Sequence, residues 1–342
     1  MVTKTLPRTL TLPDLISRFI QSRRYLSPKT VDYYQVSLGG LEWFAVKQHW
    51  PDPDEITREH IRDFMEYVAT EPHRWAGDSR WVGDRRCTFK KASAGTVHHY
   101  AKVVKTFFNW AEDEEYLEKS PTHRMKLPRP QYREVEPYSD EEVDAMLNVC
   151  EHDIQYRYRC LGIRNKAIIS VFIDTGLRLS ELASMRLSEL DPNLRQVRVM
   201  GKGAKLRVVP LNGEARKALK RYLTQARQPG GDEVWKTDDG QPLSAHSIKI
   251  MISRLKKRAG LSRSGGPHRF RHYFATRCLE NGMDINSLRL LLGHATLYMV
   301  LRYTKFVNVK RALDEHRQFS PLDSLHRGGN HNRGNDGWGW RG

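Results

Sequence analysis

With 342 residues, 39% of them hydrophobic and 28% charged, the chain is long enough for two domains with real hydrophobic cores. No apolar run approaches the roughly 18 residues of a membrane span, no apolar signal segment opens the chain, and the four scattered cysteines show no C-x-x-C pairing, so a membrane protein, an exported disulfide framework and a zinc site are not expected. The 57 Lys and Arg outnumber the 40 Asp and Glu, and this excess favours a nucleic acid as partner over an anionic membrane, because phosphate neutralisation releases counterions.

The first domain is predicted to span residues 1–120 and to be helical throughout 10–118. Apolar residues recur at helical spacing in 12–24, 61–68 and 96–116. Pro53 and Thr57 are helix-start signals ahead of the second of these segments.

A basic and aromatic insert over 73–91 separates the last two helical segments. Its basic and aromatic residues are Arg74, Trp75, Arg80, Trp81, Arg85, Arg86 and Lys90. Basic residues interleaved with tryptophans suit a loop that lies along a phosphate backbone. A solvated loop without a partner is an equally good interpretation.

A linker is predicted over 121–137, where four prolines in a basic stretch resist both helix and sheet and favour an extended chain. Ser139 followed by acidic residues then marks a new helix start, with Ser139 as the N-cap. We therefore expect a second domain over 138–320, followed by a low-complexity, disordered tail over 321–342.

The second domain is predicted to be mixed. Alternating residues in 196–200 and 206–211 predict two strands joined by a hairpin turn over 201–205. The remaining periodic segments predict helices over 140–152, 164–175, 179–187, 213–227, 244–259, 268–281, 284–292 and 295–305. The expected fold class is mainly α with one small β-hairpin.

Arg178 follows Gly176, which should break the apolar helix before it, so the arginine is expected on a tight turn that points away from the core. A guanidinium can donate to two phosphate oxygens at once, which a lysine cannot match. Glu181 is placed to orient Arg178 or a neighbouring base. Taken alone, a surface arginine that caps the turn is the better interpretation.

Lys202 is predicted at the tip of the hairpin, between two glycines that let the backbone approach a ligand closely. Its ammonium could bind phosphate or protonate a leaving oxygen. Exposed hairpin lysines are common, so this position alone is a weak signal. The spacing does not match the phosphate-binding P-loop.

Two histidines and one arginine follow near predicted helix ends. His268 and Arg271 share one face of a helix whose start is a favourable place for an anion. His294 follows the glycine that should end the next helix, where an ordinary helix-end histidine is the alternative. Tyr298 and Tyr303 come after it, and composition alone separates neither from a buried aromatic.

The motifs T-G-L-R-x-S-E-L, G-K-G-x-K-x-R-x-x-P-L, H-x-x-R-H, L-L-G-H and R-Y-T occur in this order and together resemble the tyrosine recombinase, or phage integrase, family. The resemblance covers essentially all of 138–320. The helices before it are similar to the family's core-binding domain, although that likeness is far less diagnostic.

The resemblance implies a role for each matching residue. Arg178 and Arg271 would bind the non-bridging oxygens of the scissile phosphate. Lys202 would protonate the leaving 5′ oxygen. His268 would act on the proton of the nucleophile, and His294 would support the phosphate by hydrogen bonding.

Tyr303 would be the nucleophile and form a 3′-phosphotyrosyl bond, and its place just before Thr304 makes it preferable to Tyr298. None of the family's six positions departs from the pattern, so an inactive relative is not expected. Transesterification conserves bond energy, and arginines and a lysine meet the charge at phosphate. No ATP, cofactor or metal is therefore expected, and no cluster of carboxylates suits a two-metal nuclease.

The family also implies an assembly. We expect a helical domain and a mixed α/β catalytic domain that form a C-shaped clamp on double-stranded DNA, and a homo-tetramer that joins two recombination sites through a Holliday junction. Residues 309–319 would dock in a groove of the neighbouring protomer, with packing on their own domain as the alternative.

Two other function classes stay open from the sequence. One is a type IB topoisomerase, which shares the tyrosine, arginine and lysine chemistry. The other is a non-catalytic DNA-binding protein. Integration, excision and chromosome-dimer resolution are not distinguished.

Overall fold

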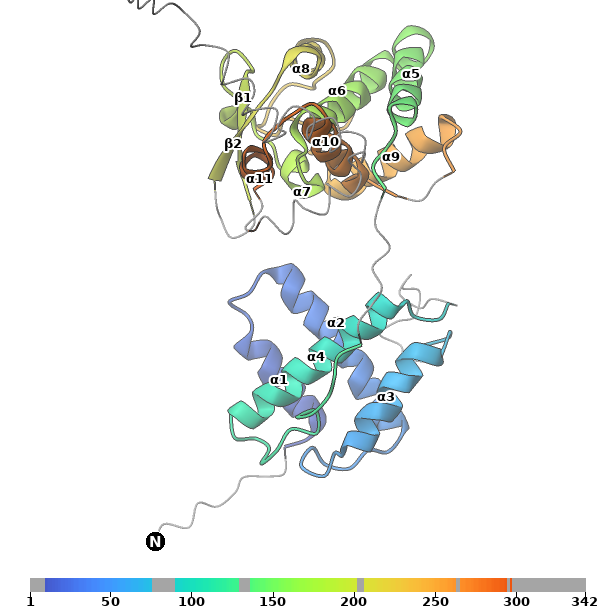
Figure 1. Ribbon diagram of the computed structural model, residues 1–342, viewed down its shortest axis with the longest axis vertical. Helices are drawn as coiled ribbons and strands as arrows, with labels where there is room; N and C mark the ends of the chain where they lie inside the picture. The colour runs from blue at the N-terminus through green and yellow to red at the C-terminus, as the bar shows by residue number, and fades with distance from the viewer. Residues whose placement is uncertain are drawn as a thin grey trace, which may run out of the picture. The chain divides into compact units, whose positions relative to one another are not determined.

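A computed structural model describes residues 10–75, 90–128, 136–201, 206–262, 265–293 and 296. The chain divides into two compact units, Met1–Arg133 and Glu134–Gly342. The described residues are mostly helical, with one antiparallel pair of strands (Figure 1). This confirms the predicted fold class, mainly α with one small β-hairpin.

The described residues of the first unit contain four α-helices, α1 (Leu12–Ser22), α2 (Pro28–Lys47), α3 (Arg58–Thr70) and α4 (Ala94–Asp113). Thr11, Ser27 and Ser93 accept hydrogen bonds from the first turns of α1, α2 and α4, as N-caps do. The prediction of helix throughout 10–118 is therefore too broad. Non-helical segments such as 48–57 separate the helices, and that segment is rich in proline and aspartate, which favour turns.

Aromatic rings form the core of the first unit. Phe19 is fully buried and lies edge-on to Tyr34, Phe107 and Trp110, with ring centroids 5.2–5.6 Å apart. Such edge-to-face contacts add to the stabilisation that the buried area already provides.

Two residues of the predicted DNA-facing insert belong to this core. Trp75 is buried against Gly40, where an added Cβ would lie 2.7 Å from the indole ring. Arg74 is also buried and donates to the carbonyls of Glu71 and Lys90. For these two residues the prediction of a contact with the phosphate backbone of DNA is wrong. The remainder of the insert, 76–89, lies outside the described residues.

The first residues of the predicted extended linker are not extended. Residues 121–124 form a turn, and the buried Ser120 and Thr122 both donate to Asn109 of α4. Lys105 donates to the carbonyl of Met125. This part of the proline-containing stretch is thus packed on α4, because its short polar side chains find partners there.

The second unit contains seven α-helices, one 3₁₀ helix and two strands in its described part. They are α5 (Asp140–Tyr156), α6 (Arg159–Thr175), α7 (Leu179–Ala183), η2 (Leu187–Glu189), β1 (Gln196–Met200), β2 (Leu206–Pro210), α8 (Gly213–Gln225), α9 (Ala245–Arg258), α10 (His268–Glu280) and α11 (Ile285–Leu292). Gln196 pairs with Pro210 and Met200 with Leu206 in an antiparallel ladder, so the two predicted strands are confirmed.

Three predicted helix bounds need correction. Helix α5 extends beyond 152 and α6 begins before 164, while α7 ends at Ala183 rather than at 187. The amide of Leu187 donates to the carbonyl of Asp232, and this long-range bond replaces helical hydrogen bonding there. The predicted helix over 295–305 lies in a part of the chain that the structure leaves undescribed, apart from residue 296.

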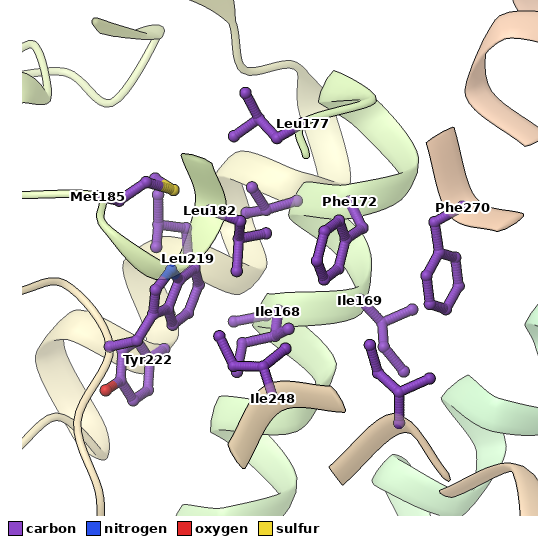
Figure 2. Close-up of a cluster of buried hydrophobic side chains, with 14 of the residues drawn as sticks. Ile168, Ile169, Phe172, Leu177, Leu182, Met185, Leu219, Tyr222, Ile248 and Phe270 are labelled. Atoms are coloured by element: carbon purple, nitrogen blue, oxygen red, sulfur yellow. The ribbon is translucent and has the colours of Figure 1, made fainter. Parts of the chain in front are cut away.

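Helix α6 is the centre of the second unit and packs against α5, α8 and α10. Ile168, Ile169 and Phe172 are fully buried, and Phe172 stacks on Phe270 of α10 at 5.6 Å (Figure 2). These contacts fix the end of α6, where the candidate site begins.

No helix among the described residues is both long enough and apolar enough to pass through a bilayer.

Candidate active site

A glycine turn joins α6 to α7 and positions Arg178. Gly176 has a φ of +59°, and a Cβ added there would lie 2.4 Å from the ring of Phe274. Only glycine satisfies both the left-handed backbone and this close approach. The chain then turns sharply, and Arg178 becomes the N-cap residue of α7. This confirms the predicted tight turn.

Arg178 and Glu181 form the first contact of the site. The Nη1 atom of Arg178 lies 2.7 Å from Oε1 of Glu181, and its backbone amide donates to Oε2 at 2.9 Å. The Arg178 side chain is 26% exposed, whereas the Glu181 side chain is 4% exposed. Glu181 thus orients Arg178, as the sequence predicted, from a position largely shielded from solvent.

Arg207 of β2 meets the same carboxylate, a contact that the sequence analysis missed. Its Nη1 and Nη2 atoms donate to Oε1 and Oε2 of Glu181 at 3.0 and 2.8 Å, a two-pronged pair. Its Nε atom donates to the carbonyl of Leu291 at 2.9 Å. The only sequence signal was the place of Arg207 in the G-K-G-x-K-x-R motif, to which no role was assigned.

The two arginines keep Glu181 ionised. Burial raises the pKa of this carboxyl group, but the hydrogen bonds from Arg207 and Arg178 oppose that effect and lower the pKa to about 2. The group formed by Arg178, Glu181 and Arg207 consequently carries one negative and two positive charges at neutral pH, which leaves a net positive charge at the turn.

Arg271 of α10 is 4% exposed and connects two helix ends. Its Nη1 atom donates to the carbonyl of Gly176 at 2.8 Å, and Nη2 donates to the carbonyl of Leu292 at 2.6 Å. Each terminal guanidinium nitrogen carries two N–H groups, so these bonds are compatible with a further acceptor such as phosphate. Arg271 therefore adjoins the turn that presents Arg178.

His268 opens α10, on the same helix as Arg271. The residue is exposed overall, yet the protein atoms around its ring desolvate it, and Arg271 and Arg178 add positive charge nearby. Both effects disfavour the protonated, positively charged imidazole and lower the pKa of His268. The neutral form of the imidazole, which can accept a proton, is therefore favoured.

The other three candidate residues, Lys202, His294 and Tyr303, lie outside the described residues. The structure thus brings Arg178, His268 and Arg271 together and leaves the positions of the other three as predictions. No group of three or more His, Cys, Asp or Glu side chains that could hold a metal occurs in the described ranges.

Comparisons with known proteins identify relatives of this chain. The model of the phage integrase family matches residues 138–308. The chain is 29% identical to the tyrosine recombinase XerC of Lactobacillus delbrueckii subsp. bulgaricus over 91% of this chain and 99% of the relative. It is 27% identical to the tyrosine recombinase XerD of Listeria monocytogenes serotype 4b over 90% of this chain and 99% of the relative.

Solved structures show the same fold. The XerH site-specific recombinase bound to a palindromic difH substrate matches with a TM-score of 0.65 and 21% identity, covering 90% of this chain and 84% of that one. The Tn1549 transposon integrase bound to transposon right-end DNA matches with a TM-score of 0.67 and 19% identity, covering 91% and 99%. The family match spans the unit that holds Arg178, His268 and Arg271, and the chain belongs to the phage integrase family of tyrosine recombinases.

Proposed function

We propose that this chain is a site-specific DNA recombinase that cleaves and rejoins strands through a covalent bond to Tyr303. The observation that carries the proposal is that Arg271 contacts the same turn that presents Arg178, with His268 near both arginines. Two guanidinium groups at one point suit a phosphodiester whose oxygens gain charge in the transition state.

The reaction balances without an external energy source. The Oη atom of Tyr303 attacks phosphorus, a P–O(Tyr) bond forms, and the bond from phosphorus to the 5′ oxygen breaks. His268 accepts the proton of the tyrosine, and Lys202 donates a proton to the leaving 5′ oxygen. A 5′ hydroxyl of the partner strand then reverses these steps and releases Tyr303.

Arg178, Arg271 and His294 serve the phosphate in this proposal. The arginines bind its non-bridging oxygens, and His294 donates a hydrogen bond to it. Support for His294 is the end of α11, where Arg271 binds the carbonyl of Leu292 and Gly293 adopts the left-handed conformation directly before the histidine.

A homo-tetramer on two synapsed sites is the proposed assembly. The second unit has a groove of about 830 Å³ whose lining includes Asp140, Asp144, Asp174 and Glu214. Arg277 also lines this groove and pairs with Asp140, but the carboxylates outnumber it. Such a groove suits the basic, apolar segment 309–319 of a second copy, which contains Lys310 and Arg311. Deletion of that segment should abolish the tetramer on DNA in analytical ultracentrifugation while the monomer still binds a single site.

The test of the function is Tyr303→Phe on a nicked duplex. The duplex is first selected by the protein from a random library, and its nick traps the covalent adduct. We expect the substitution to abolish the adduct and leave binding intact, because only the nucleophilic oxygen is lost. Adduct formation by the Phe variant would contradict the assignment and direct attention to Tyr298.

Type IB topoisomerase chemistry is the second candidate. Such an enzyme would relax supercoiled plasmids that lack the selected site, whereas a recombinase depends on the site. A plasmid relaxation assay with and without the site separates the two.

A further inference from the structure

Arg207 connects three segments of the second unit that adjoin site residues. It belongs to β2, shortly after Lys202 in the chain, and it reaches Glu181 of α7 and the carbonyl of Leu291 at the end of α11. Its three printed contacts are 2.8–3.0 Å long, and its side chain is 12% exposed. Contacts of this length from a largely buried arginine hold all three segments in one arrangement.

Gly293 shows how closely the end of α11 approaches Arg207. A Cβ added to Gly293 would lie 3.1 Å from Cδ and 3.2 Å from Nη1 of Arg207, and the φ of Gly293 is +62°. The glycine therefore admits the guanidinium as well as the turn. The arginine lies against the backbone directly before His294.

The two carboxylate oxygens of Glu181 accept hydrogen bonds from both arginines, and the number that each arginine donates determines how Arg207 affects Arg178. Arg207 donates to both carboxylate oxygens, while Arg178 contributes one side-chain donor, Nη1, to Oε1. Without Arg207, Glu181 would be a buried carboxylate with a single arginine. Arg178 would then satisfy both oxygens itself, because fork-to-fork pairing is the strongest geometry for such a pair. That pairing would withdraw the Arg178 donors from a phosphate.

We propose that Arg207 is a positioning residue of this active site: by occupying both oxygens of Glu181 it keeps Arg178 available to the scissile phosphate, and by binding the carbonyl of Leu291 it fixes the end of α11, which directly precedes His294. The inference rests on the proposed function, since it concerns the rate of covalent adduct formation. Arg207 itself touches no reacting atom in this proposal.

The test compares Arg207→Gln with the unsubstituted full-length chain on the nicked duplex described above. Under single-turnover conditions with protein in excess, we expect the adduct to form about 10- to 100-fold more slowly, the loss typical when a supporting partner of a site residue is removed. Affinity for the uncleaved duplex should stay unchanged, because binding draws on many phosphate contacts. Arg207→Lys keeps the charge but not the fork, so it should recover only part of the rate.

Arg198→Gln is the matched control. Arg198 lies on β1 of the same hairpin, is exposed, and donates to the carbonyl of Ser188. Its substitution should leave both the adduct rate and the binding unchanged. A loss equal to that of Arg207→Gln would mean that any arginine of the hairpin is needed, which overturns the inference.

A double-mutant cycle separates positioning from a general structural role. If Arg207 acts through Glu181, the double variant should lose less rate than the product of the fold losses of Arg207→Gln and Glu181→Gln measured singly. Fully multiplicative losses, or an adduct rate in Arg207→Gln equal to that of the unsubstituted chain, overturn the inference alone. An unsubstituted chain that forms no adduct overturns the proposed function and this inference together. Because Arg207→Lys retains the charge, it serves the same comparison if Arg207→Gln does not fold.

Discussion

The two units of the chain are stabilised by different means. In the first unit, stacked and edge-on rings such as Phe19, Phe107 and Trp110 fill the core, and the buried charged side chain among its described residues is Arg74. In the second unit, the apolar core around α6 is joined by buried ions, among them Glu181, Arg269 and Arg271.

The difference shows what each kind of packing achieves. Aromatic packing stabilises a unit as a whole, because many large rings contact one another in its core. A buried ion pair contributes little net stability, but each partner demands a particular geometry from the other. In the second unit, two of the buried ions, Glu181 and Arg271, contact the turn that presents Arg178, and their hydrogen bonds fix its geometry. Others, such as Arg269 with Glu142, lie elsewhere in the unit.

Phe107→Ala gives the largest expected effect and tests the first half of this comparison. The ring is fully buried and contacts Phe19 and Phe108, so its loss should destabilise the first unit by about 3–5 kcal/mol. Hydrogen exchange of the full chain should show faster exchange in peptides of the first unit alone. Val46→Ala, at an exposed position of α2, is the control. Equal acceleration in both units would contradict the comparison.

Lys202→Ala and Arg178→Ala sharpen the second half. Each should slow adduct formation by about 10²–10³-fold on an ordinary phosphodiester. When sulfur replaces the bridging 5′ oxygen, the leaving thiolate needs no proton, so Lys202→Ala should recover most of its rate and Arg178→Ala should not. Equal losses of Lys202→Ala on both substrates would show that this lysine only positions the phosphate.

Glu181→Gln tests whether the buried carboxylate also adds stability. Its pKa falls from 4.5 to about 2 on folding, so its contribution is present above pH 4.5 and lost as the pH falls towards 2. By proton linkage this shift corresponds to about 3 kcal/mol. Denaturant unfolding of the second unit should lose this acid dependence in the variant.

Glu214→Gln is the control for that measurement. The carboxylate of Glu214 is at the surface, where its hydrogen bond with Lys217 lowers its pKa. Its substitution should leave the acid dependence almost unchanged, because solvent screens an exposed pair. An equal effect of both substitutions would mean that burial does not distinguish the ion pairs of the second unit.

The smallest expected effect concerns the insert of the first unit. Arg74 and Trp75 are structural, so the change is confined to Arg80, Arg85 and Arg86, replaced together by glutamine. If these arginines contact phosphates, the slope of log affinity against log salt should become shallower by about one for each contact. An unchanged slope would make the insert a loop without a DNA partner.

Local signals in the sequence predicted much of this structure. The Ser139 N-cap, the two strands 196–200 and 206–211 and the glycine turn before Arg178 each depend on neighbouring residues, and the structure confirms all three apart from one residue at the end of the second strand. Residues whose roles depend on distant partners were not predictable in this way. Arg207 reaches Leu291, 84 positions away, and no periodicity in β2 signals that contact.

The same limit explains the remaining errors. Trp75 was interpreted from its basic neighbours, but the space beside Gly40 decides its place. Helix α7 was predicted to extend to residue 187. The amide of Leu187 instead donates to the distant carbonyl of Asp232, which replaces regular helical hydrogen bonding. Burial of Arg271 was likewise hidden, because its partner Gly176 is 95 positions away.

The long reach of Arg271 and Arg207 has a consequence for the synthesis of the protein. The arginines bind the carbonyls of Leu292 and Leu291, and these two residues are synthesised after nearly all of the other described residues. A nascent chain that stops before α11 can fold its first unit, since domains fold as units from the N-terminus. It cannot yet hold its arginines as the finished site does. Products of translation that end before α11 would therefore contain the first unit without an assembled cleavage site.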